Sequence, residues 1–529
     1  MSEKDTVLSI DCGTQSLRAL VFSPRGEQLC CQKVTYVPYF SCKPGYAEQE
    51  PAVWWNALCS AVKKIKSDKP ELFNSIRGVT ITAQRDTLVL VDASGKSMRP
   101  AILWLDSRKA LPPYIPGSSE QLLLKMVHMD EAIFKTQEAG KSNWLRSNEP
   151  EIWEKTAKVL LLSGFLNHKL CGEFSDSVAS QIGHIPFNYK KQEWAASAHR
   201  NSKMFPVESE KLPFLVAPGA TIGVVTVRAS EETGLPVGLP VIASGSDKGC
   251  ETIGMGVLDE SAVSLSFGTT ATVQTTSCRY MEPIRFMPSY PAPIPGYYNP
   301  EVEIFRGYWM ITWFKNQFAY EEVLEAEKAG LSPESILNKH LKNTAPGSYG
   351  LMLQPYWTAG LENPSVKGAL IGFGDIHERP HVYRAIIEGL AYGLREGVEA
   401  LERVSGKKVI KASASGGASQ ADEICQITSD VLNKPIVRGL TPEASGLGAA
   451  MCCAAGIGWY DSVKNAVRGM YNCAKTFEPI SGNVELYDSL YRKVYKKMTA
   501  SLIPLYESIR EITNYPERVT YSRTRRNEQ

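Results

Sequence analysis

The sequence predicts an α/β fold built from two domains of similar internal plan. A chain of 529 residues is too long for one ordinary hydrophobic core. Short apolar runs typical of strands are interspersed with longer stretches of helical periodicity, the mixture expected of α/β proteins. A strand, a Gly-Thr turn and a second strand occur twice, roughly half the chain apart. This repeat favours two domains of related architecture.

The first copy lies at the start of the chain. Residues 7–11 and 17–22 are apolar runs, and the turn Cys12-Gly13-Thr14-Gln15 separates them. A further turn, Ser23-Pro24-Arg25-Gly26, follows at a spacing typical of a β-meander. The second copy has strand-like residues at 262–267 and 271–275 around Gly268-Thr269-Thr270.

A turn-rich stretch at residues 235–240 separates the two copies and leads into a short predicted strand at 241–243. The small and charged residues at 244–249 then predict a flexible loop. We place the boundary there, with an N-terminal domain at 1–244, a C-terminal domain at 245–480, and a C-terminal helix and basic tail at 481–529. Helical periodicity predicts helices at 52–66, 382–404, 420–432 and 484–509.

Composition argues against several classes of protein. A hydrophobic content of 43% with 22% charged residues is that of an ordinary globular chain. The formal net charge is only +2, and a basic cluster, which nucleic-acid binding would require, occurs only in the tail after Pro516. We interpret that tail as a solvated terminus. No apolar stretch approaches the roughly 18 residues of a membrane span, and the N-terminus lacks a signal-peptide core. We expect a cytoplasmic protein with neither nucleic-acid nor membrane partners.

The cysteines and histidines do not predict a metal site. The twelve cysteines are scattered without a CxxC spacing, and the seven histidines form no cluster in the sequence. Buried reduced thiols are the expectation, in preference to a zinc site or a disulfide framework.

Two hairpin turns are candidate phosphate sites. In Asp11-Cys12-Gly13-Thr14 the glycine lets backbone N–H groups approach a phosphate, and the threonine adds a donor. Asp11 at the strand end can face a metal ion, and Arg18 follows on the next strand. The same reasoning applies to Gly268-Thr269. An ordinary hairpin turn is the alternative in each case.

A third glycine-bearing turn, Gly416-Gly417, precedes the helix predicted to begin near Gln420. Backbone dipoles at a helix N-terminus favour anions, and glycines let a flat ring lie close to the main chain. A plain turn is again the alternative.

Asp247 is the candidate catalytic base. It follows the short strand at 241–243 and is bracketed by Gly245 and Gly249, so we expect a flexible loop to present its carboxylate to a cleft between the domains. There it would take a proton from an attacking hydroxyl, as phosphoryl transfer to an alcohol requires. The alternative is an aspartate in a surface turn.

Polar residues suited to sugar hydroxyls follow another predicted strand. Gln84-Arg85-Asp86 interrupts the apolar runs 78–81 and 88–91. Trp104 offers a ring face for the apolar side of a carbohydrate, although a core position would suit it equally.

Taken in order, these segments resemble the FGGY carbohydrate kinases, the family of glycerol kinase and xylulokinase. The resemblance runs from about residue 7 to residue 460. Residues 11–18 are similar to the family's first phosphate hairpin, and residues 44–51 with Trp54-Trp55 resemble a stretch typical of xylulokinases. The strongest match, residues 368–373 followed by 381–388, resembles the family's C-terminal signature. Residues 443–450 fit its small-residue helix near the nucleotide.

The resemblance implies two actin-like, ribonuclease-H-like ATPase domains flanking a central cleft, in which the γ-phosphoryl group of ATP passes to a small sugar or polyol. It implies that Asp247 is the base and that Asp11 lies near Mg²⁺. It also implies the other site residues: Thr14, Arg18, Gly268 and Thr269 at the ATP phosphates, Gly416 and Gly417 at the adenosine, and Arg85, Asp86 and Trp104 in the sugar pocket.

The substrate stays open at this level. Gln84-Arg85-Asp86 is close to the Gln-Arg-Glu of glycerol kinases and unlike the Gln-Met-His of xylulokinases. Lys248 stands where glycerol kinases carry Gln and xylulokinases carry Asn. Because Lys248 and Arg85 are both cationic, an acidic sugar is a further substrate to test. A pentulose such as xylulose is the leading hypothesis, with glycerol, a tetritol or an autoinducer-2-type sugar as alternatives. A non-catalytic, nucleotide-binding sugar sensor and a homodimeric assembly also stay open.

Overall fold

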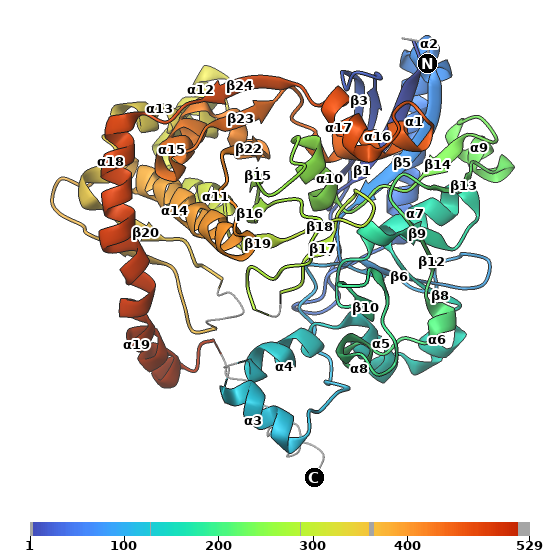
Figure 1. The fold of residues 1–529 in the computed structure, drawn as a ribbon, viewed down its shortest axis with the longest axis horizontal. Coiled ribbons are helices and arrows are strands. Elements are labelled where there is room, and N and C mark those ends of the chain that lie inside the picture. Colours follow the sequence, from blue (N-terminus) through green and yellow to red (C-terminus); the bar gives the residue numbers. More distant parts are fainter. Residues whose placement is uncertain (1–3, 127–128, 286, 359–363, 517–529) are drawn as a thin grey trace.

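Two six-stranded sheets form the framework of the protein (Figure 1). The computed structural model describes residues 4–126, 129–285, 287–358 and 364–516, so the basic tail predicted after Pro516 lies outside the described residues. The first sheet has the order β13-β14-β5-β1-β2-β3 and the second the order β19-β16-β15-β22-β23-β24. The first contains β1 Thr6–Cys12, β2 Ser16–Phe22, β3 Gln28–Thr35, β5 Ile76–Ala83, β13 Thr221–Val224 and β14 Pro240–Ile242. The second contains β15 Ala262–Phe267, β16 Ala271–Gln274, β19 Glu301–Ile304, β22 Lys411–Ser415, β23 Ile436–Gly439 and β24 Cys473–Phe477.

The two sheets share one topology. In the first, β1, β2 and β3 pair antiparallel, β5 joins β1 in parallel, β14 joins β5 in parallel, and β13 closes the edge antiparallel. In the second, β15, β16 and β19 form the antiparallel meander, and β22, β23 and β24 repeat the remaining pairings. The predicted repeat is therefore a repeat of a whole sheet. We call the part built on the first sheet the first half and the part built on the second sheet the second half, and the predicted meander is present in both.

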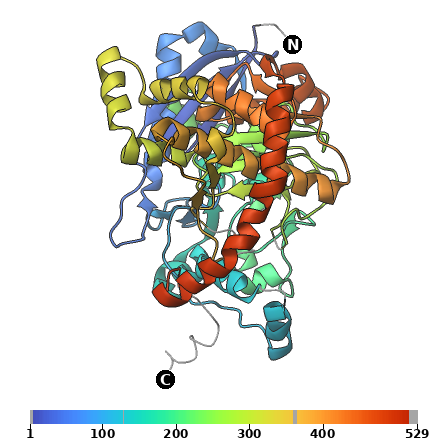
Figure 2. The same cartoon turned by 90° about the vertical axis from the view of Figure 1, so that its left-hand side faces the viewer.

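Helices cover both sheets, and the predicted helical segments are present. Helix α1 Pro51–Asp68 packs beside β2 and β3, and α14 Arg379–Ser405 packs beside β16 and β19. The stretch predicted at 484–509 is one long helical rod (Figure 2), composed of α18 Ser481–Leu490, a π-helical turn at Tyr491–Tyr495, and α19 Lys496–Thr513. Tyrosines of this rod lie in the core of the second half. Helix α15 Asp422–Leu432 is another helix of the second half.

A smaller layer extends the first half. Its four-stranded sheet consists of β4 Glu48–Gln49, β7 Ala101–Ile102, β6 Leu88–Val91 and β8 Lys158–Leu161. Around it lie α3 Ser118–Met126, α4 Asp130–Glu138, α5 Lys141–Asn148, α6 Pro150–Lys155 and α7 Leu162–Cys171. Other second-half helices are α11 Trp309–Phe318, α12 Tyr320–Ala329 and α13 Pro333–Asn343. Within the described residues no helix is both long and apolar enough to cross a membrane.

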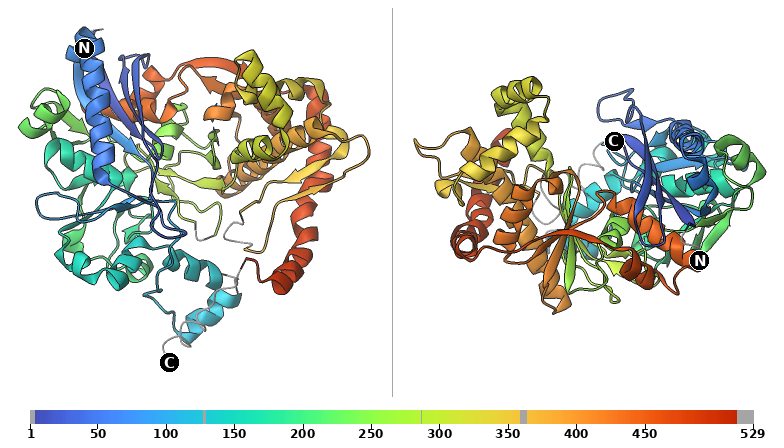
Figure 3. Two further views of the ribbon diagram at one scale, coloured as in Figure 1. Left: turned by 180° about the vertical axis from the view of Figure 1, so that it is seen from behind. Right: turned by 90° about the horizontal axis from the view of Figure 1, so that it is seen from above.

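Two helices join the halves, as the views from behind and above show (Figure 3). They are α10 Asp247–Gly254 and α16 Ala444–Gly456, and α16 also packs against β1 and β5 of the first sheet. Their shared core contains Leu20 and Phe22 of β2, Ile253 of α10 and Leu447 of α16. Helix α16 therefore lies on the first sheet, although in the sequence it falls between β23 and β24 of the second sheet. Helix α17 Val463–Met470 packs on α16.

Glycines allow α10 and α16 to meet at backbone distance. A Cβ added to Gly448 would overlap the carbonyl oxygen of Cys250, and one added to Gly254 would overlap the carbonyl oxygen of Ala444. A Cβ on Gly446 would overlap the side chain of Leu20 on the other face of α16. Both faces of α16 are thus packed without room for a side chain, which accounts for its small-residue composition.

We expect Gly448→Ala to lower the free energy of unfolding by about 3 kcal/mol, because the added methyl group must push two backbones apart. The matched control is Gly482→Ala in α18, where an added Cβ meets no atom within 4 Å. That variant should change stability by less than about 1 kcal/mol. Urea denaturation of both variants measures the difference, and equal stabilities would contradict the close crossing.

Candidate active site

Asp247 is the first residue of helix α10, so the expectation of a flexible loop over residues 244–249 is wrong. Ser246 caps the helix by accepting a hydrogen bond from the backbone N–H of Gly249 at 3.3 Å. The bracketing glycines serve close packing, since a Cβ on Gly245 would lie 2.7 Å from Pro293 and one on Gly249 would lie 3.0 Å from it. The backbone N–H of Lys248 donates to the Asp247 carboxylate at 2.8 Å. The carboxylate is therefore held in a defined direction while its side chain keeps 31% exposure.

Arg85 reaches from the first half to the second. It follows β5, whose last residue, Ala83, bridges to Ser246. Its guanidinium donates two hydrogen bonds to Glu301 on β19, at 3.0 and 3.1 Å, and lies over the ring of Tyr290. Its Nε is 3.9 Å from Asp247 Oδ1. Arg85 thus ties the predicted sugar strand, the predicted base and the second sheet together.

Burial and charge set the ionisation of these acids. Burial raises the pKa of Asp247 above its ordinary value, while the Arg85 guanidinium and the Lys248 ammonium oppose the rise. Burial would also raise the pKa of Glu301, but its pairing with Arg85 holds that pKa below the ordinary value. Burial and the adjacent Glu301 raise the pKa of Glu303 well above the ordinary value. Glu301 is therefore the carboxylate that ionises more readily beside Arg85, and Glu303 is the one that keeps its proton more readily.

The first hairpin carries Asp11 and Arg18 in register on β1 and β2. Arg18 lies 3.6 Å from Asp11 and 3.2 Å from Glu443. Burial raises the pKa of Asp11 to about 7; Arg18 opposes this rise, whereas the carboxylates of Asp247, Glu443 and Glu251 add to it.

Mg²⁺ fits this position. Within the described residues no three His, Cys, Asp or Glu side chains are arranged to hold a metal ion alone. Mg²⁺ in phosphoryl-transfer sites is bound through one or two carboxylates together with waters and phosphates, so Asp11 alone satisfies the protein's share. A divalent cation there would also oppose the burial and the carboxylate repulsion that together raise the pKa of Asp11.

The hydroxyl of Thr14 faces the predicted sugar residues. It donates to Gln84 Oε1 at 2.6 Å and accepts from the Trp104 indole at 3.0 Å. A phosphate contact of Thr14 would therefore use its backbone N–H group. Trp104 is 42% exposed, so it is not a core residue and its ring is accessible to a ligand.

The other two predicted turns lie against each other. Gly268 and Thr269 connect β15 to β16, and Gly416 follows β22, the parallel neighbour of β15. Gly416 has a φ of +86°, and a Cβ there would lie 2.9 Å from the backbone of Phe267. A Cβ on Gly417 would meet no atom within 4 Å, so the main chain is open there to a flat ring.

One detail of the third turn differs from expectation. Gly416 precedes a short 3-10 turn that begins at Gly417, and α15 begins at Asp422, two residues later than predicted. The first turn of α15 carries Asp422 and Glu423, and Asp422 pairs with Arg438 and Lys475. Acids of the chain itself thus occupy the first turn of α15, and a ligand at the Gly416-Gly417 turn stays a prediction.

Asp86 lies in a compact cluster of charges. Its carboxylate is 2.5 Å from the Lys141 ammonium and 2.8 Å from His184 Nδ1, and it accepts from the His184 backbone at 3.0 Å. Burial would raise the pKa of Asp86, but Lys141 and His184 hold it well below the ordinary value. The backbone of Asp86 is in the left-handed region, with a φ of +51°.

Sequence reasoning missed several residues of this site. Glu301 and Glu303 alternate along one strand, so both point to one face, and this spacing was the available signal. Lys141 and His184 carried no pattern of their own. The remaining missed residues contact the neighbours of Asp247: Tyr290 lies under Arg85, Glu251 and Ser266 bind Lys248, and Ser415 binds Glu251.

The chain is similar to known proteins over most of its length. The sequence matches the models of the FGGY family of carbohydrate kinases, the N-terminal domain at residues 6–254 and the C-terminal domain at 263–457. It is 27% identical to an uncharacterized sugar kinase of Escherichia coli K12, YgcE, over 503 residues and 94% of each chain. It is also 27% identical to a xylulose kinase of Lactococcus lactis, covering 93% of this chain and 96% of that protein.

A solved gluconate kinase from Lactobacillus acidophilus has a TM-score of 0.80 at 18% identity, covering 96% of this chain and 99% of that one. This likeness, together with the two-sheet topology, confirms the predicted two-domain, actin-like α/β fold.

We expect Glu301→Gln to lower the free energy of unfolding by about 2 kcal/mol, because Glu303 can ionise and partly replace the lost charge beside Arg85. The double variant E301Q/E303Q should cost about 3–5 kcal/mol, since it leaves a buried guanidinium with fewer carboxylate partners. Urea denaturation measures both. Glu193→Gln, in an exposed pair with Lys191, is the control and should cost less than about 1 kcal/mol. A double variant no less stable than E301Q would contradict this account.

Proposed function

We propose that this chain, which belongs to the FGGY family of carbohydrate kinases and is a sugar kinase, phosphorylates a neutral ketopentose such as xylulose with MgATP. The observation that carries this proposal is the placement of Asp247. Its carboxylate is fixed at the start of α10 beside Arg85, and the next residue, Lys248, bonds Ser266 on the strand that leads to the Gly268 turn. An incoming alcohol and a nucleotide phosphate would meet at that point.

Charge pairing favours a neutral substrate. Arg85 is bound by Glu301 and Lys141 is bound by Asp86, while the Lys248 side chain extends away from these residues toward Ser266. A sugar carboxylate would have to compete with these carboxylate partners and lose its own hydration. The relative named xylulose kinase supports a ketopentose as the neutral sugar.

We assign the proton transfer to Asp247. It accepts the proton of a sugar hydroxyl as that oxygen forms a bond to the γ-phosphorus, and the bond from the γ-phosphorus to the bridging oxygen of ADP breaks. Arg85, Asp86 and Trp104 would hold the sugar in line for this attack, and Asp11 would hold Mg²⁺, which when bound neutralises phosphate charge. The nucleotide residues in this assignment are Thr14, Arg18, Gly268 and Thr269 for the phosphates and Gly416 and Gly417 for the adenosine. A cytoplasmic location belongs to the proposal, because ATP is supplied there.

The test is ADP release, measured with a coupled assay over pentuloses, glycerol, tetritols, autoinducer-2-type sugars and sugar acids. Xylulose should give the highest kcat/KM. Asp247→Asn should lower kcat by about a thousandfold or more while thermal shift still detects ATP binding. A sugar acid preferred over every neutral sugar would overturn the substrate assignment. Retention of full turnover by D247N would overturn the role of Asp247.

The pH dependence offers a second test. Asp247 accepts a proton only when ionised, so kcat/KM should fall as the pH drops through its pKa, which lies above the ordinary 3.8. Arg85 lowers that pKa, whereas Glu251 raises it. Arg85→Met should therefore move the acid limb to higher pH, whatever it does to KM. Arg228→Met removes an exposed arginine and should leave the limb unmoved. An acid limb that stays in place in R85M would contradict this assignment.

A further inference from the structure

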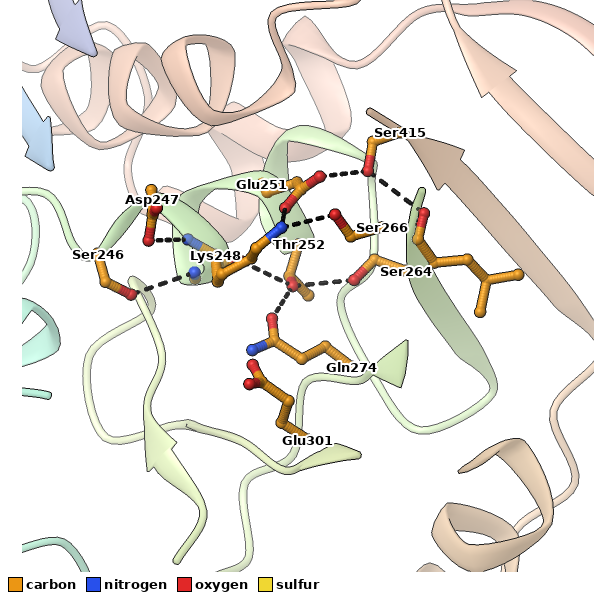
Figure 4. Close-up of polar contacts among 12 residues, drawn as sticks. Ser246, Asp247, Lys248, Glu251, Thr252, Ser264, Ser266, Gln274, Glu301 and Ser415 are labelled. Atoms are coloured by element: carbon orange, nitrogen blue, oxygen red, sulfur yellow. Dashed lines mark hydrogen bonds and ion pairs between the residues drawn. The ribbon is translucent and has the colours of Figure 1, made fainter. Parts of the chain in front are cut away.

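Lys248 follows the proposed base in sequence, but its side chain extends toward the second sheet (Figure 4). Its ammonium is 2.8 Å from Glu251 Oε2 on the next turn of α10 and donates to Ser266 Oγ at 2.6 Å. The side chain is 25% exposed, so a ligand can reach it. None of its hydrogen bonds within the described residues goes to Arg85, Asp86 or Trp104, the proposed sugar residues.

Ser266 places this ammonium beside the proposed phosphate turn. Its Oγ is 3.6 Å from the position of a Cβ on Gly268. In the repeated topology, Ser266 precedes Gly268 by two residues, as Asp11 precedes Gly13 in the first hairpin. The first hairpin thus presents a carboxylate at this position, whereas the second presents a serine that holds a cation.

Glu251 connects the same ammonium to the proposed adenosine turn. Its Oε1 accepts a hydrogen bond from Ser415 Oγ at 2.5 Å (Figure 4). Ser415 pairs with Ser266 in the parallel register of β15 and β22, and it directly precedes Gly416. The Lys248–Glu251 pair therefore contacts the strand residues that lead into both turns.

We infer that Lys248 binds the terminal phosphate of the nucleotide, and that Glu251 is a positioning residue that aims it there. The inference rests on the proposed function. An ammonium has three donors, and Glu251 and Ser266 take two of them, which leaves one for a phosphate oxygen. A cation held at this place stabilises the charge that spreads over the phosphoryl oxygens during transfer. Lys248 therefore acts on the nucleotide and does not select an acidic sugar.

The test is equilibrium binding by calorimetry, with Mg²⁺ and without sugar, of ADP and of a non-hydrolysable ATP analogue. Lys248→Gln should weaken binding of the analogue by about 10- to 100-fold, because the variant loses one charge-assisted hydrogen bond. It should weaken binding of ADP by less than about threefold. Lys248→Arg should recover part of the loss, and Glu251→Gln should show a smaller selective loss. Lys64→Gln, an exposed lysine on α1, is the control and should bind both nucleotides like the wild type.

The double variant K248Q/E251Q removes both buried charges, so it tests the inference if K248Q fails to fold. The same selective loss for the analogue is expected. Equal losses for ADP and the analogue, or unchanged binding of both, would overturn the inference, as would a change confined to sugar binding in a thermal-shift assay. These readouts need no turnover. If wild-type protein binds the analogue but phosphorylates no sugar, the proposed substrate fails while the result on Lys248 stands.

Discussion

The backbone-level crossing of α10 and α16 is the constraint on which the site depends. Asp247 begins α10, so whatever fixes the axis of that helix also fixes the direction of the carboxylate. Gly254 and Gly448 let the two helices meet without intervening side chains, and Gly446 brings α16 equally close to Leu20 of the first sheet. Side-chain rotamers cannot absorb a displacement where backbones touch. This packing fixes the position of Asp247 relative to both the first sheet and the second half.

Charge pairs then connect the halves around this rigid junction. Arg85 of the first half binds Glu301 of the second, and Arg18 on β2 binds Glu443 beside α16. Ion pairs of this kind contribute little net stability to the fold, because the cost of desolvating the charges offsets their attraction. Their effect is on geometry, since a guanidinium that makes two parallel hydrogen bonds accepts one orientation. Moving the halves apart would separate these pairs and would require water to replace them.

The repeated sheet explains why the proposed nucleotide contacts come in pairs. Each sheet ends its first strand in a Gly-Thr turn, and both turns belong to the meander side of the same topology. The copies have diverged where the chemistry differs. The first carries Asp11 and Arg18, and the second carries Ser266 with Lys248 bound to it.

Local sequence was enough to predict the repeated strand-turn-strand units, the long helices and the family. It also pointed to Asp247 as the candidate catalytic base. These features depend on periodicity, turn residues and short motifs, which are properties of neighbouring residues. Tertiary structure alone decided that Asp247 starts a capped helix, because Gly245 and Gly249 pack on Pro293 and do not confer flexibility. It also decided that Glu301 binds Arg85 and that Lys248 turns toward Ser266, since these partners are 216 and 18 residues apart. A side chain's partner across such distances is chosen by the packing of sheets and helices, and no local pattern encodes it.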